Sequence, residues 1–526
     1  MTTPQPISNP QGSGLTLLTD LYQLTMGQGY WQEGLLDVQA SFTMFYRENP
    51  YGGGYGIACG IDQVADLAEG FCFTDDDLAY LASLPAPGGG LLFSPEFLRY
   101  LGTLKLSVDI DTVPEGSIVF PRMPLVRVTG PLLQCQLLET ALLNAVNFQS
   151  LIATKAARIC QVAKGPVAAF GLRRAQGPDG GISSDRAAYI GGCASVANVL
   201  AGKLYGIPVS GTHAHSWVMA FPSELDAFRA YAKAFPNNCI LLVDTYDVEQ
   251  GVRNAITVGL EMRERGEKLL GIRIDSGDLA WLSKKARAML DEAGLTDCTI
   301  VASNELDEYT ISSLHEQGAC IDSYGVGTKL ATAYDQAALG GVYKLTAIKL
   351  PGESRWHPRL KVSEQVSKTT IPGPQGLRRY YHEDGTFAGD MVYSVTNPPA
   401  RGDEVIVDPL DTTRRKNLSD RPYEELLVPL VRQGEVVGRE DIHTVRDRVS
   451  QQLALLDPSI KRFTNPHGYP AGVERGLYDL RTALVLASRG IDPHDLSLEP
   501  TALEEVASML ESSRETGAAA SGLSDR

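Results

Sequence analysis

Short apolar segments alternate with helical segments between residues 167 and 327, and this alternation constrains the fold more than any other feature. Six segments are predicted strands: 167–171, 204–209, 239–244, 270–275, 299–303 and 323–327. Strands that alternate with helices at this spacing predict a parallel sheet, which can be open or closed into a barrel. Residues 343–348 are predicted to form a further strand.

The positions of the polar residues favour the closed barrel. Polar side chains follow the strand ends at Arg173, His215, Asp247, Asp275, Ser303-Asn304 and Thr328. In a barrel such residues converge on one mouth, whereas an open sheet gathers them at a single switch point. No Gly-x-Gly-x-x-Gly pattern follows the first strand, so a dinucleotide-binding sheet lacks its main signal.

The remaining chain is predicted to form α/β structure on both sides of the barrel. Segment 21–26 is a predicted helix capped by Thr19 or Asp20, and segment 40–47 is a predicted strand. The predicted organisation is a disordered lead (1–14), a mixed α/β domain (15–131), a β/α barrel (132–365), a C-terminal segment that partly packs on the first domain (366–510) and a flexible tail (511–526).

Charge and cysteine usage limit the class of function. The 526 residues carry a formal net charge of -16, which makes nucleic acid an unfavourable partner. An anionic substrate therefore needs a local cluster of arginine, lysine and backbone N–H groups. The eight cysteines are scattered without a Cys-x-x-Cys pair, which indicates a reducing cytoplasm. No signal peptide or membrane-spanning segment is predicted.

Two histidines lie one residue apart in the segment Gly211-Thr212-His213-Ala214-His215-Ser216. A histidine at a strand end can act as a nucleophile or exchange a proton near neutral pH. It can also be a hydrogen-bonded core residue. A metal pair is a third interpretation, but no third ligand is grouped with the two imidazoles.

Charged and small residues at the other strand ends indicate a phosphorylated sugar and a carboxylate as ligands. Arg273 lies within an apolar strand, where an unpaired guanidinium is costly and a carboxylate partner is favoured. Asp275 and Asp278 could bind sugar hydroxyls or a divalent cation, or could cap the next helix. Gly327 and Thr328 offer N–H and hydroxyl groups to a phosphate. Chemistry alone therefore predicts a barrel enzyme that handles a phosphosugar.

Six segments resemble the motifs of the nicotinate phosphoribosyltransferase family. They are residues 18–26, 170–175, 211–216, 242–247, 271–279 and 324–328, and they occur in the order found in the family. The resemblance runs from about residue 15 to the glycine-rich segment near Gly373 and is weaker beyond it.

The resemblance implies a reaction, a fold and a set of site residues. Nicotinate and 5-phosphoribosyl 1-diphosphate would give nicotinate mononucleotide and diphosphate, with coupled ATP hydrolysis and Mg²⁺, in NAD biosynthesis. The fold would be the irregular (type II) phosphoribosyltransferase barrel, in a homodimer with shared active sites. The residues implied are His215 (phosphorylated) and Asp275 for catalysis, Tyr22, Thr212, Arg273 and Arg173 for nicotinate, and Gly327, Thr328 and Ser276 for the phosphoribosyl group. Nothing catalytic carries over to His213, and the magnesium ligands are not identified.

Two other functions remain open at this point. Nicotinamide phosphoribosyltransferase shares the barrel, the histidine and the Asp-Ser-Gly-Asp strand end, although the segment Asp20-Leu21-Tyr22-Gln23 favours the enzyme that uses the acid. A quinolinate-using enzyme would leave the histidine motif unexplained. A noncatalytic nucleotide sensor on the same barrel would not need both His215 and a complete phosphosugar site.

Overall fold

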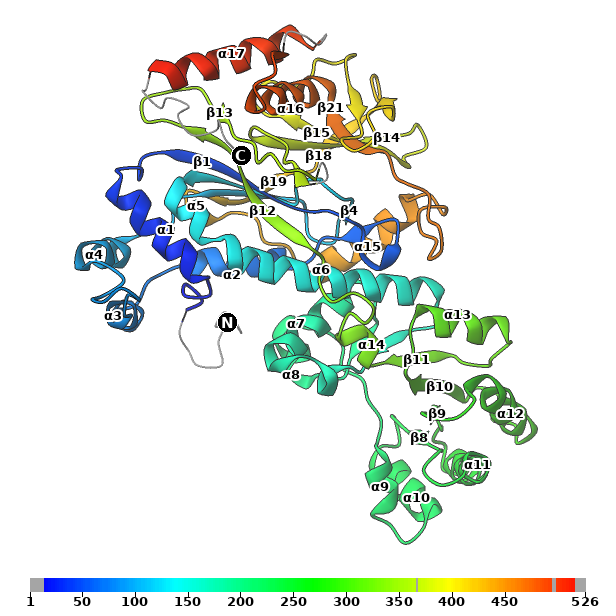
Figure 1. Cartoon of the computed structure of the whole chain (residues 1–526). Coiled ribbons are helices and arrows are strands. Elements are labelled where there is room, and N and C mark those ends of the chain that lie inside the picture. Colours follow the sequence, from blue (N-terminus) through cyan, green and yellow to red (C-terminus); the bar gives the residue numbers. More distant parts are fainter. Residues whose placement is uncertain (1–13, 366–367, 494–497, 516–526) are drawn as a thin grey trace. The chain divides into compact units, whose positions relative to one another are not determined.

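The computed structural model describes residues 14–365, 368–493 and 498–515 (Figure 1). Residues 1–13 of the predicted lead and 516–526 of the predicted tail lie outside this range. The chain divides into two compact units. We call residues 148–337 with 442–450 the parallel unit, and the remaining described residues the mixed unit.

The parallel unit contains six strands that all pair in parallel. Their order in the sheet is β7-β6-β11-β10-β9-β8. The strands are β6 (Val167–Ala169), β7 (Ser195–Val196), β8 (Ile240–Leu242), β9 (Gly271–Ile274), β10 (Thr299–Asn304) and β11 (Ser323–Val326). The predicted parallel sheet is therefore present.

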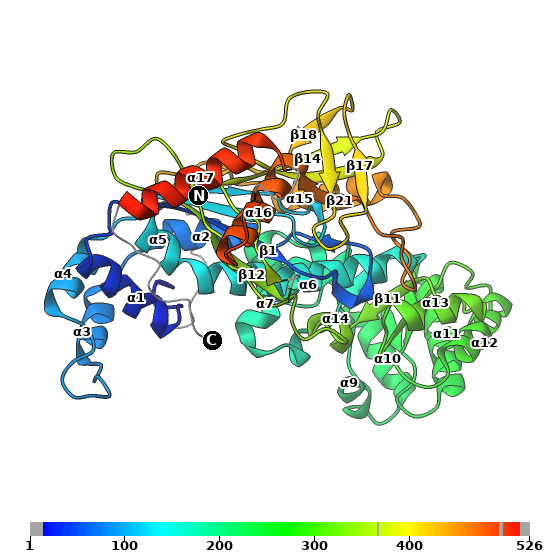
Figure 2. The ribbon, with the colours of Figure 1, turned by 45° about the horizontal axis from the view of Figure 1, so that its top comes forward.

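Helices connect successive strands, as a parallel sheet requires. Figures 1 and 2 show α10 to α13 arranged around the strands β8 to β11. The helices of this unit are α7 (Gly177–Ile190), α8 (Val199–Tyr205), α9 (His215–Met219), α10 (Glu224–Ala234), α11 (Val248–Glu264), α12 (Leu279–Glu292), α13 (Glu308–Glu316) and α14 (Thr328–Ala331), with the 3-10 turn η2 (Leu172–Arg174). The unit also includes the C-terminal part of α6 (Glu139–Val162) and the N-terminal part of α15 (Ile442–Leu455).

The prediction of a strand at 204–209 is wrong. Residues 204–205 end helix α8, and Gly206 follows with a φ of 69°, a left-handed conformation that ends the helix at low cost. Only Val209 pairs with the sheet, through an isolated parallel bridge to Val196. The second strand is instead β7, which is only two residues long.

A buried ion cluster anchors the start of α13 to α6. The Glu308 carboxylate forms ion pairs with the Lys155 ammonium group and with Arg158 Nε, each at 2.8 Å, and all three side chains are at most 2% exposed. Removing one partner of such a cluster would leave a buried charge, so the cluster constrains the chain strongly. It fixes α13 directly after the strand end that carries Asn304.

The mixed unit contains a seven-stranded sheet in the order β13-β12-β1-β5-β3-β19-β20. Its strands pair antiparallel. They are β1 (Gln39–Tyr46), β3 (Asp109–Thr112), β5 (Val126–Pro131), β12 (Gly341–Lys349), β13 (His357–Pro358), β19 (Val428–Arg432) and β20 (Glu435–Val436). Strands β2 (Gly56–Ile57) and β4 (Ile118–Val119) form a separate pair.

The C-terminal region adds a second sheet to the mixed unit, in the order β17-β16-β21-β15-β14-β18. Its strands are β14 (Gln375–Tyr381), β15 (Phe387–Ser394), β16 (Val405–Val407), β17 (Arg415–Asn417), β18 (Tyr423–Glu425) and β21 (Ala471–Glu474). The buried pair Arg379–Asp390 joins β14 to β15 at 2.7 Å.

The helices of the mixed unit are α1 (Leu21–Gln32), α2 (Ile61–Glu69), α3 (Asp75–Ser83), α4 (Pro95–Thr103), α5 (Leu132–Leu137), the start of α6, α16 (Arg475–Ser488) and α17 (Pro500–Glu515), with the short turn η1 (Pro50–Gly52). Residues of α1, α3, α4 and α5 form a hydrophobic core that includes Leu24, Leu81, Phe97 and Leu133. None of the helices in the described part of the chain is long and apolar enough to cross a membrane.

The observed division of the chain differs from the predicted one in three places. Residues 132–147, predicted to belong to the barrel, are part of the mixed unit. Residues 343–348 form a strand, but as β12 it pairs antiparallel with β1, and residues 338–441 belong to the mixed unit. Residues 442–450, from the predicted C-terminal segment, belong to the parallel unit instead. There Tyr189 and His443 share a hydrogen bond of 2.7 Å. Helix α17 also continues to Glu515, into the predicted tail.

Candidate functional site

A cavity of about 480 Å³ opens at the carboxyl ends of the parallel strands. Residues that follow β6, β9, β10 and β11 contribute to it, which is where barrel enzymes hold their ligands. Its lining consists of Phe170, Leu172, Arg173, Arg174, Ala197, Gly211, Thr212, His213, Ala214, Arg273, Asp275, Ser303, Asn304, Glu305, Gly325, Gly327 and Thr328. The predicted convergence of Arg173, Asp275, Ser303-Asn304 and Thr328 is therefore present.

Arg273 is the most buried cation in this lining. Its Nη2 donates to the carbonyl oxygen of His213 at 3.2 Å, while its buried Nε has no hydrogen-bond partner in the described structure. Burial lowers the pKa of this guanidinium, and the carboxylates of Asp275 and Asp244 oppose that shift. A buried donor that lacks a partner calls for an explanation, and the position of Arg273 in the cavity lining makes an anionic ligand a candidate partner.

Asp244 connects the ends of β8 and β9. Its Oδ2 accepts from the Asp275 N–H at 3.0 Å and from the Ser276 hydroxyl at 2.6 Å. The side chain is 1% exposed, and its buried Oδ1 accepts no hydrogen bond from any described residue. This residue therefore places a negative charge at the base of the site.

His215 begins helix α9 and faces two carboxylates. Its Nδ1 lies 3.2 Å from the Thr245 hydroxyl, and its Nε2 lies 4.0 Å from Asp244 Oδ1 and 3.9 Å from Asp275 Oδ2. The imidazole is 41% exposed, so it is open to a reactant. His215 is not among the residues that line the cavity, but Asp275 joins it to the lining.

His213 has a different environment from His215. Its Nε2 accepts from the backbone N–H of Leu242 at 3.1 Å, and the residue is only 7% exposed. The ring packs against Phe228 and Tyr231. Burial, together with the nearby charge of Arg273, lowers the pKa of this imidazole to about 4. His213 is therefore neutral near pH 7, and its ring is held in the core.

Small residues shape the opposite end of the cavity. A Cβ atom on Gly325 would lie 2.6 Å from the Phe170 ring, and one on Gly171 would lie 2.3 Å from Ala331 Cβ. The Thr328 hydroxyl donates to Glu305 Oε1 at 3.1 Å. Because Gly171 has no side chain, the segment after β6 can approach Gly327 and Ala331 closely. Gly327 and Thr328, at the start of α14, line the cavity.

Several other predicted residues lie elsewhere. Tyr22 is on α1 in the mixed unit, 46% exposed, with its pKa raised by partial burial and by the carboxylate of Glu139. The Ser276 hydroxyl is used by Asp244 and is not in the lining. Asp247 was expected at the barrel mouth, but its side chain caps α11 by accepting from the Gln250 N–H. Asp278 similarly caps α12 through the Trp281 N–H.

The described residues contain no group of three or more histidine, cysteine or acidic side chains placed to hold a metal ion. The described residues thus form no complete set of side-chain ligands for a cation. Mg²⁺, however, is often held by one or two carboxylates together with the phosphates of a substrate. Asp275, which lines the cavity, is compatible with that mode.

Comparison with known proteins identifies the family. Models of the nicotinate phosphoribosyltransferase N-terminal domain, the nicotinate phosphoribosyltransferase family and its C-terminal domain match residues 17–147, 181–385 and 375–481. A nicotinate phosphoribosyltransferase of Bacillus subtilis is 42% identical over 468 residues, which cover 87% of this chain and 92% of that protein. The chain belongs to the nicotinate phosphoribosyltransferase family. Nicotinate phosphoribosyltransferase 2 of Arabidopsis thaliana is 37% identical, over 88% of this chain and 93% of the relative.

Solved structures confirm the fold of this nicotinate phosphoribosyltransferase family member. Human nicotinic acid phosphoribosyltransferase superposes with a TM-score of 0.77 at 32% identity and covers 89% of this chain and 99% of its own. A nicotinate-nucleotide pyrophosphorylase from Pyrococcus furiosus shares the fold at a TM-score of 0.65 and 22% identity, over 86% of this chain and 98% of its own. The predicted family, type II phosphoribosyltransferase fold and activity in NAD biosynthesis from nicotinate are therefore confirmed.

Asp244 and Thr245 are the site residues that sequence reasoning missed. Both lie in the matching segment 242–247, in which the sequence pattern predicts Asp247 as the polar residue that follows the strand. Asp244 is the first polar residue after β8, which ends at Leu242 and is followed by Val243. Its place right after the strand was the signal that could have identified it.

The low pKa of His213 predicts a pH-dependent stability. An unfolded histidine has a pKa near 6.5, whereas that of folded His213 is about 4, so the unfolded state binds the proton more readily. The contribution of neutral His213 to the free energy of unfolding is therefore fully present above about pH 7. It decreases as the pH falls from about 6.5 to 4, by up to about 3 kcal/mol. Denaturant unfolding of the wild type and of His213→Gln at several pH values measures this. Identical pH slopes for the two proteins would contradict it.

Proposed function

We propose that the cavity of the parallel unit holds nicotinate and 5-phosphoribosyl 1-diphosphate side by side, and that His215 couples the transfer to ATP hydrolysis. The pyridine nitrogen would form a bond to the anomeric carbon of ribose as the bond to the diphosphate oxygen breaks. Holding both reactants removes much of the entropic cost of their encounter. The observation that carries the proposal is the unpartnered Nε of Arg273 beside a ligand-sized cavity.

Arg273 supplies the selectivity for an acid. A guanidinium can grip a carboxylate with two charge-assisted hydrogen bonds, whereas a neutral amide would leave the buried charge uncompensated. Thr212 and Arg173 line the same cavity and would contact the pyridine ring or its carboxylate. This arrangement supports nicotinate over nicotinamide as the acceptor.

The phosphosugar would bind at the end of the cavity formed by Gly327 and Thr328. A phosphate oxygen would accept from the Thr328 hydroxyl in place of Glu305. Asp275 lines the same cavity and lies 3.9 Å from His215 Nε2, and its carboxylate could stabilise positive charge that develops on the ribose. Ser276 would have to turn from Asp244 to reach a phosphate, and its role remains a prediction.

Mg²⁺ would be held mainly by substrate phosphates, with Asp275 as its protein contact. When bound, the ion would supply charge for the leaving diphosphate. ATP would transfer its γ-phosphoryl group to the His215 ring, with a nitrogen–phosphorus bond formed and ADP released. The carboxylates of Asp244 and Asp275 can stabilise the cationic imidazole during that step.

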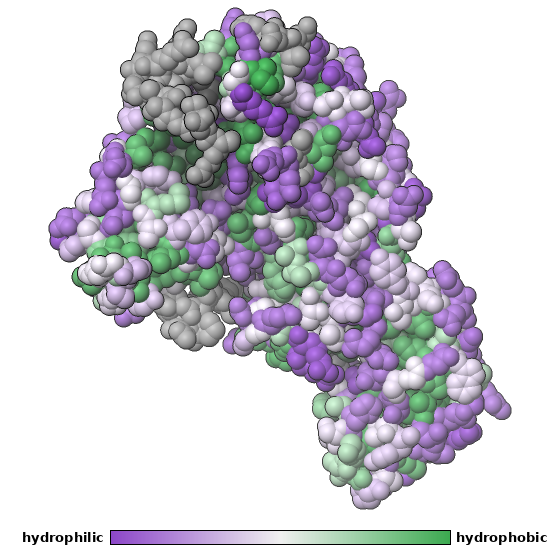
Figure 3. All heavy atoms as spheres, in the orientation of Figure 1, coloured by the Kyte–Doolittle hydropathy of each residue, from purple (hydrophilic) through white to green (hydrophobic). Residues whose placement is uncertain are grey.

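We further propose a cytoplasmic homodimer in which the partner subunit's Tyr22 completes the site. Tyr22 does not line the cavity, and three apolar neighbours on or beside α1 are also exposed: Leu18, Leu21 and Met26. Hydrophobic residues are visible at the surface where α1, α3 and α4 lie (Figure 3). An exposed apolar face of this kind favours association. All eight cysteines are free thiols, which supports a reducing compartment.

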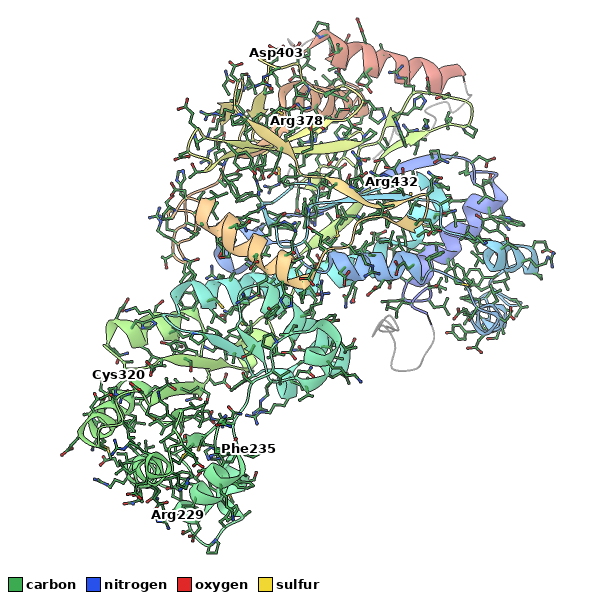
Figure 4. The ribbon with its side chains drawn as sticks, turned by 180° about the vertical axis from the view of Figure 1, so that it is seen from behind. Arg229, Phe235, Cys320, Arg378, Asp403 and Arg432 are labelled. Carbon is green, nitrogen blue, oxygen red and sulfur yellow. The ribbon has the colours of Figure 1, made fainter. Side chains whose placement is uncertain are left out.

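Arg273→Ala should weaken nicotinate use far more than use of the phosphosugar. Losing a charge-assisted pair typically costs about 2–5 kcal/mol, so we expect KM or kcat/KM for nicotinate to change by a factor of about 30 to several thousand. Product formation with nicotinate, nicotinamide and quinolinate in parallel measures this. Arg229→Ala, an exposed arginine paired with Glu261 on the surface (Figure 4), is the matched control. Undiminished nicotinate use by Arg273→Ala would exclude this role.

Mixing two inactive variants should restore activity if the site is shared. Tyr22→Ala and His215→Ala homodimers should each be impaired, while hybrid dimers should contain one site with both native residues. We expect recovery of about a quarter of the wild-type activity after subunit exchange, because half of the dimers are hybrids with one intact site each. Exchange is verified with differently tagged subunits. No recovery after verified exchange would argue against the shared site.

His215 should carry an acid-labile, base-stable phosphoryl group after incubation with ATP. His215→Ala should lose ATP hydrolysis coupled to transfer yet keep slow transfer, because the phosphosugar already has its leaving group. His213→Gln should keep the modification, since His213 is buried and hydrogen-bonded to β8. Mass spectrometry under alkaline conditions locates the phosphate. Phosphate on His213, or on neither histidine in an enzyme that couples ATP, would refute the assignment.

A further inference from the structure

We propose that His213 is a positioning residue that closes the gap between β7 and β8 and thereby sets the position of Arg273. The ring of His213 fastens its own segment to β8, and its backbone carbonyl oxygen holds the guanidinium. The role of Arg273 in nicotinate binding, on which this inference rests, belongs to the proposed function. The contacts themselves are independent of it.

The gap separates β7 from β8, the two edge strands of the parallel sheet. Strands β7 and β8 are at opposite ends of the strand order, and no backbone ladder joins them in the described structure. A barrel that lacks such a ladder needs another connection at this place to keep its shape. The segment from Pro208 to His213 provides it.

One side of this segment is attached to β7. The Val196 N–H donates to the Pro208 carbonyl oxygen at 3.0 Å, and the Ser210 N–H donates to the Val196 carbonyl oxygen at 3.0 Å. The hydroxyl groups of Ser195 and Ser210 add a hydrogen bond of 2.6 Å. These contacts hold the chain beside β7 up to residue 210.

The other side is attached to β8 through one side chain. His213 Nε2 accepts from the Leu242 N–H at 3.1 Å, and this edge of β8 has no strand partner among the described residues. The imidazole thus replaces the carbonyl group that a neighbouring strand would supply. Because Nε2 accepts, the single proton of the neutral ring must lie on Nδ1, which faces the Ala214 carbonyl oxygen at 3.4 Å.

This attachment leads directly to Arg273. Leu242 is the residue opposite Arg273 in the β8–β9 pairing, so the anchor of the ring and the guanidinium lie on neighbouring strands at the same level. The backbone carbonyl oxygen of the same His213 accepts from Arg273 Nη2 at 3.2 Å. Thr212, the preceding residue, lines the cavity. The His213 ring therefore orients Arg273 and Thr212, two of the residues proposed to contact nicotinate.

The packing around the ring excludes a direct reaction at His213. Phe228 and Tyr231 cover it, with ring centroids 6.1 Å and 4.7 Å away, and both nitrogens face backbone groups. The charged and titratable groups near it are Arg273 and His215, and both oppose protonation of the ring. His213 therefore acts through Arg273 and does not contact the reacting atoms.

Two variants separate the hydrogen bond from the bulk of the ring. His213→Leu keeps an apolar side chain but leaves the Leu242 N–H without an acceptor. His213→Gln places an amide oxygen near the position of Nε2 and can restore the acceptor. We expect His213→Leu to raise KM for nicotinate about tenfold or more, while kcat and the KM for the phosphosugar change less than about threefold. In His213→Gln, we expect the KM for nicotinate to stay within about threefold of the wild-type value. Equal effects of the two variants, or an unchanged KM in His213→Leu, would overturn the proposal.

A spectroscopic measurement tests the attachment without relying on activity. In ¹⁵N-histidine-labelled protein, the signals that disappear in His213→Gln belong to His213. We expect them to show the neutral ring with its proton on Nδ1 at pH 7. A proton on Nε2 would overturn the proposal even if His213→Leu failed to fold. If this tautomer is observed but the wild type forms no product from nicotinate, the proposed function fails and the attachment remains.

Discussion

The site depends on the buried positive charge of Arg273, which lies near the carboxyl end of the parallel strand β9. A buried guanidinium is stable only when acceptors surround it, and here one acceptor is a backbone carbonyl oxygen while Nε has none. The carboxylates of Asp244 and Asp275 balance part of the charge from the ends of β8 and β9. Arg273 also lines the cavity, so the fold keeps a cation with one unpartnered donor beside the place where an anionic ligand would bind.

The same carboxylates connect this cation to the histidine. Asp275 lines the cavity and approaches His215, and Asp244 holds the backbone of Asp275 while facing the same imidazole. Two histidines one residue apart therefore acquire different properties from their surroundings. His213 is buried, neutral and bonded to β8, whereas His215 is exposed at the start of α9 beside two negative charges.

Most of the site could be predicted from the sequence because it lies directly after apolar strands. Asp275 and Thr328 follow that pattern, Arg273 stands out as a charge within the apolar strand β9, and all three line the cavity. The pattern failed where the strands are shortest. Two-residue β7 is too short to show a period, and the apolar residues at 204–209 belong to the end of a helix and a connecting segment. Asp247 offers an equally polar position three residues beyond Asp244, and the hydrogen bonds show that Asp244 binds the backbone of Asp275 whereas Asp247 caps α11.

A crystal structure of the protein with nicotinate tests the central claim most directly. We predict the nicotinate carboxylate within hydrogen-bonding distance of the Arg273 guanidinium, about 2.7–3.2 Å, with Nε no longer unpartnered. The pyridine ring should lie beside Thr212, with its nitrogen directed toward the end of the cavity formed by Gly327 and Thr328. A carboxylate bound to Arg174 or outside this cavity, with Arg273 making the same contacts as before, would contradict the account.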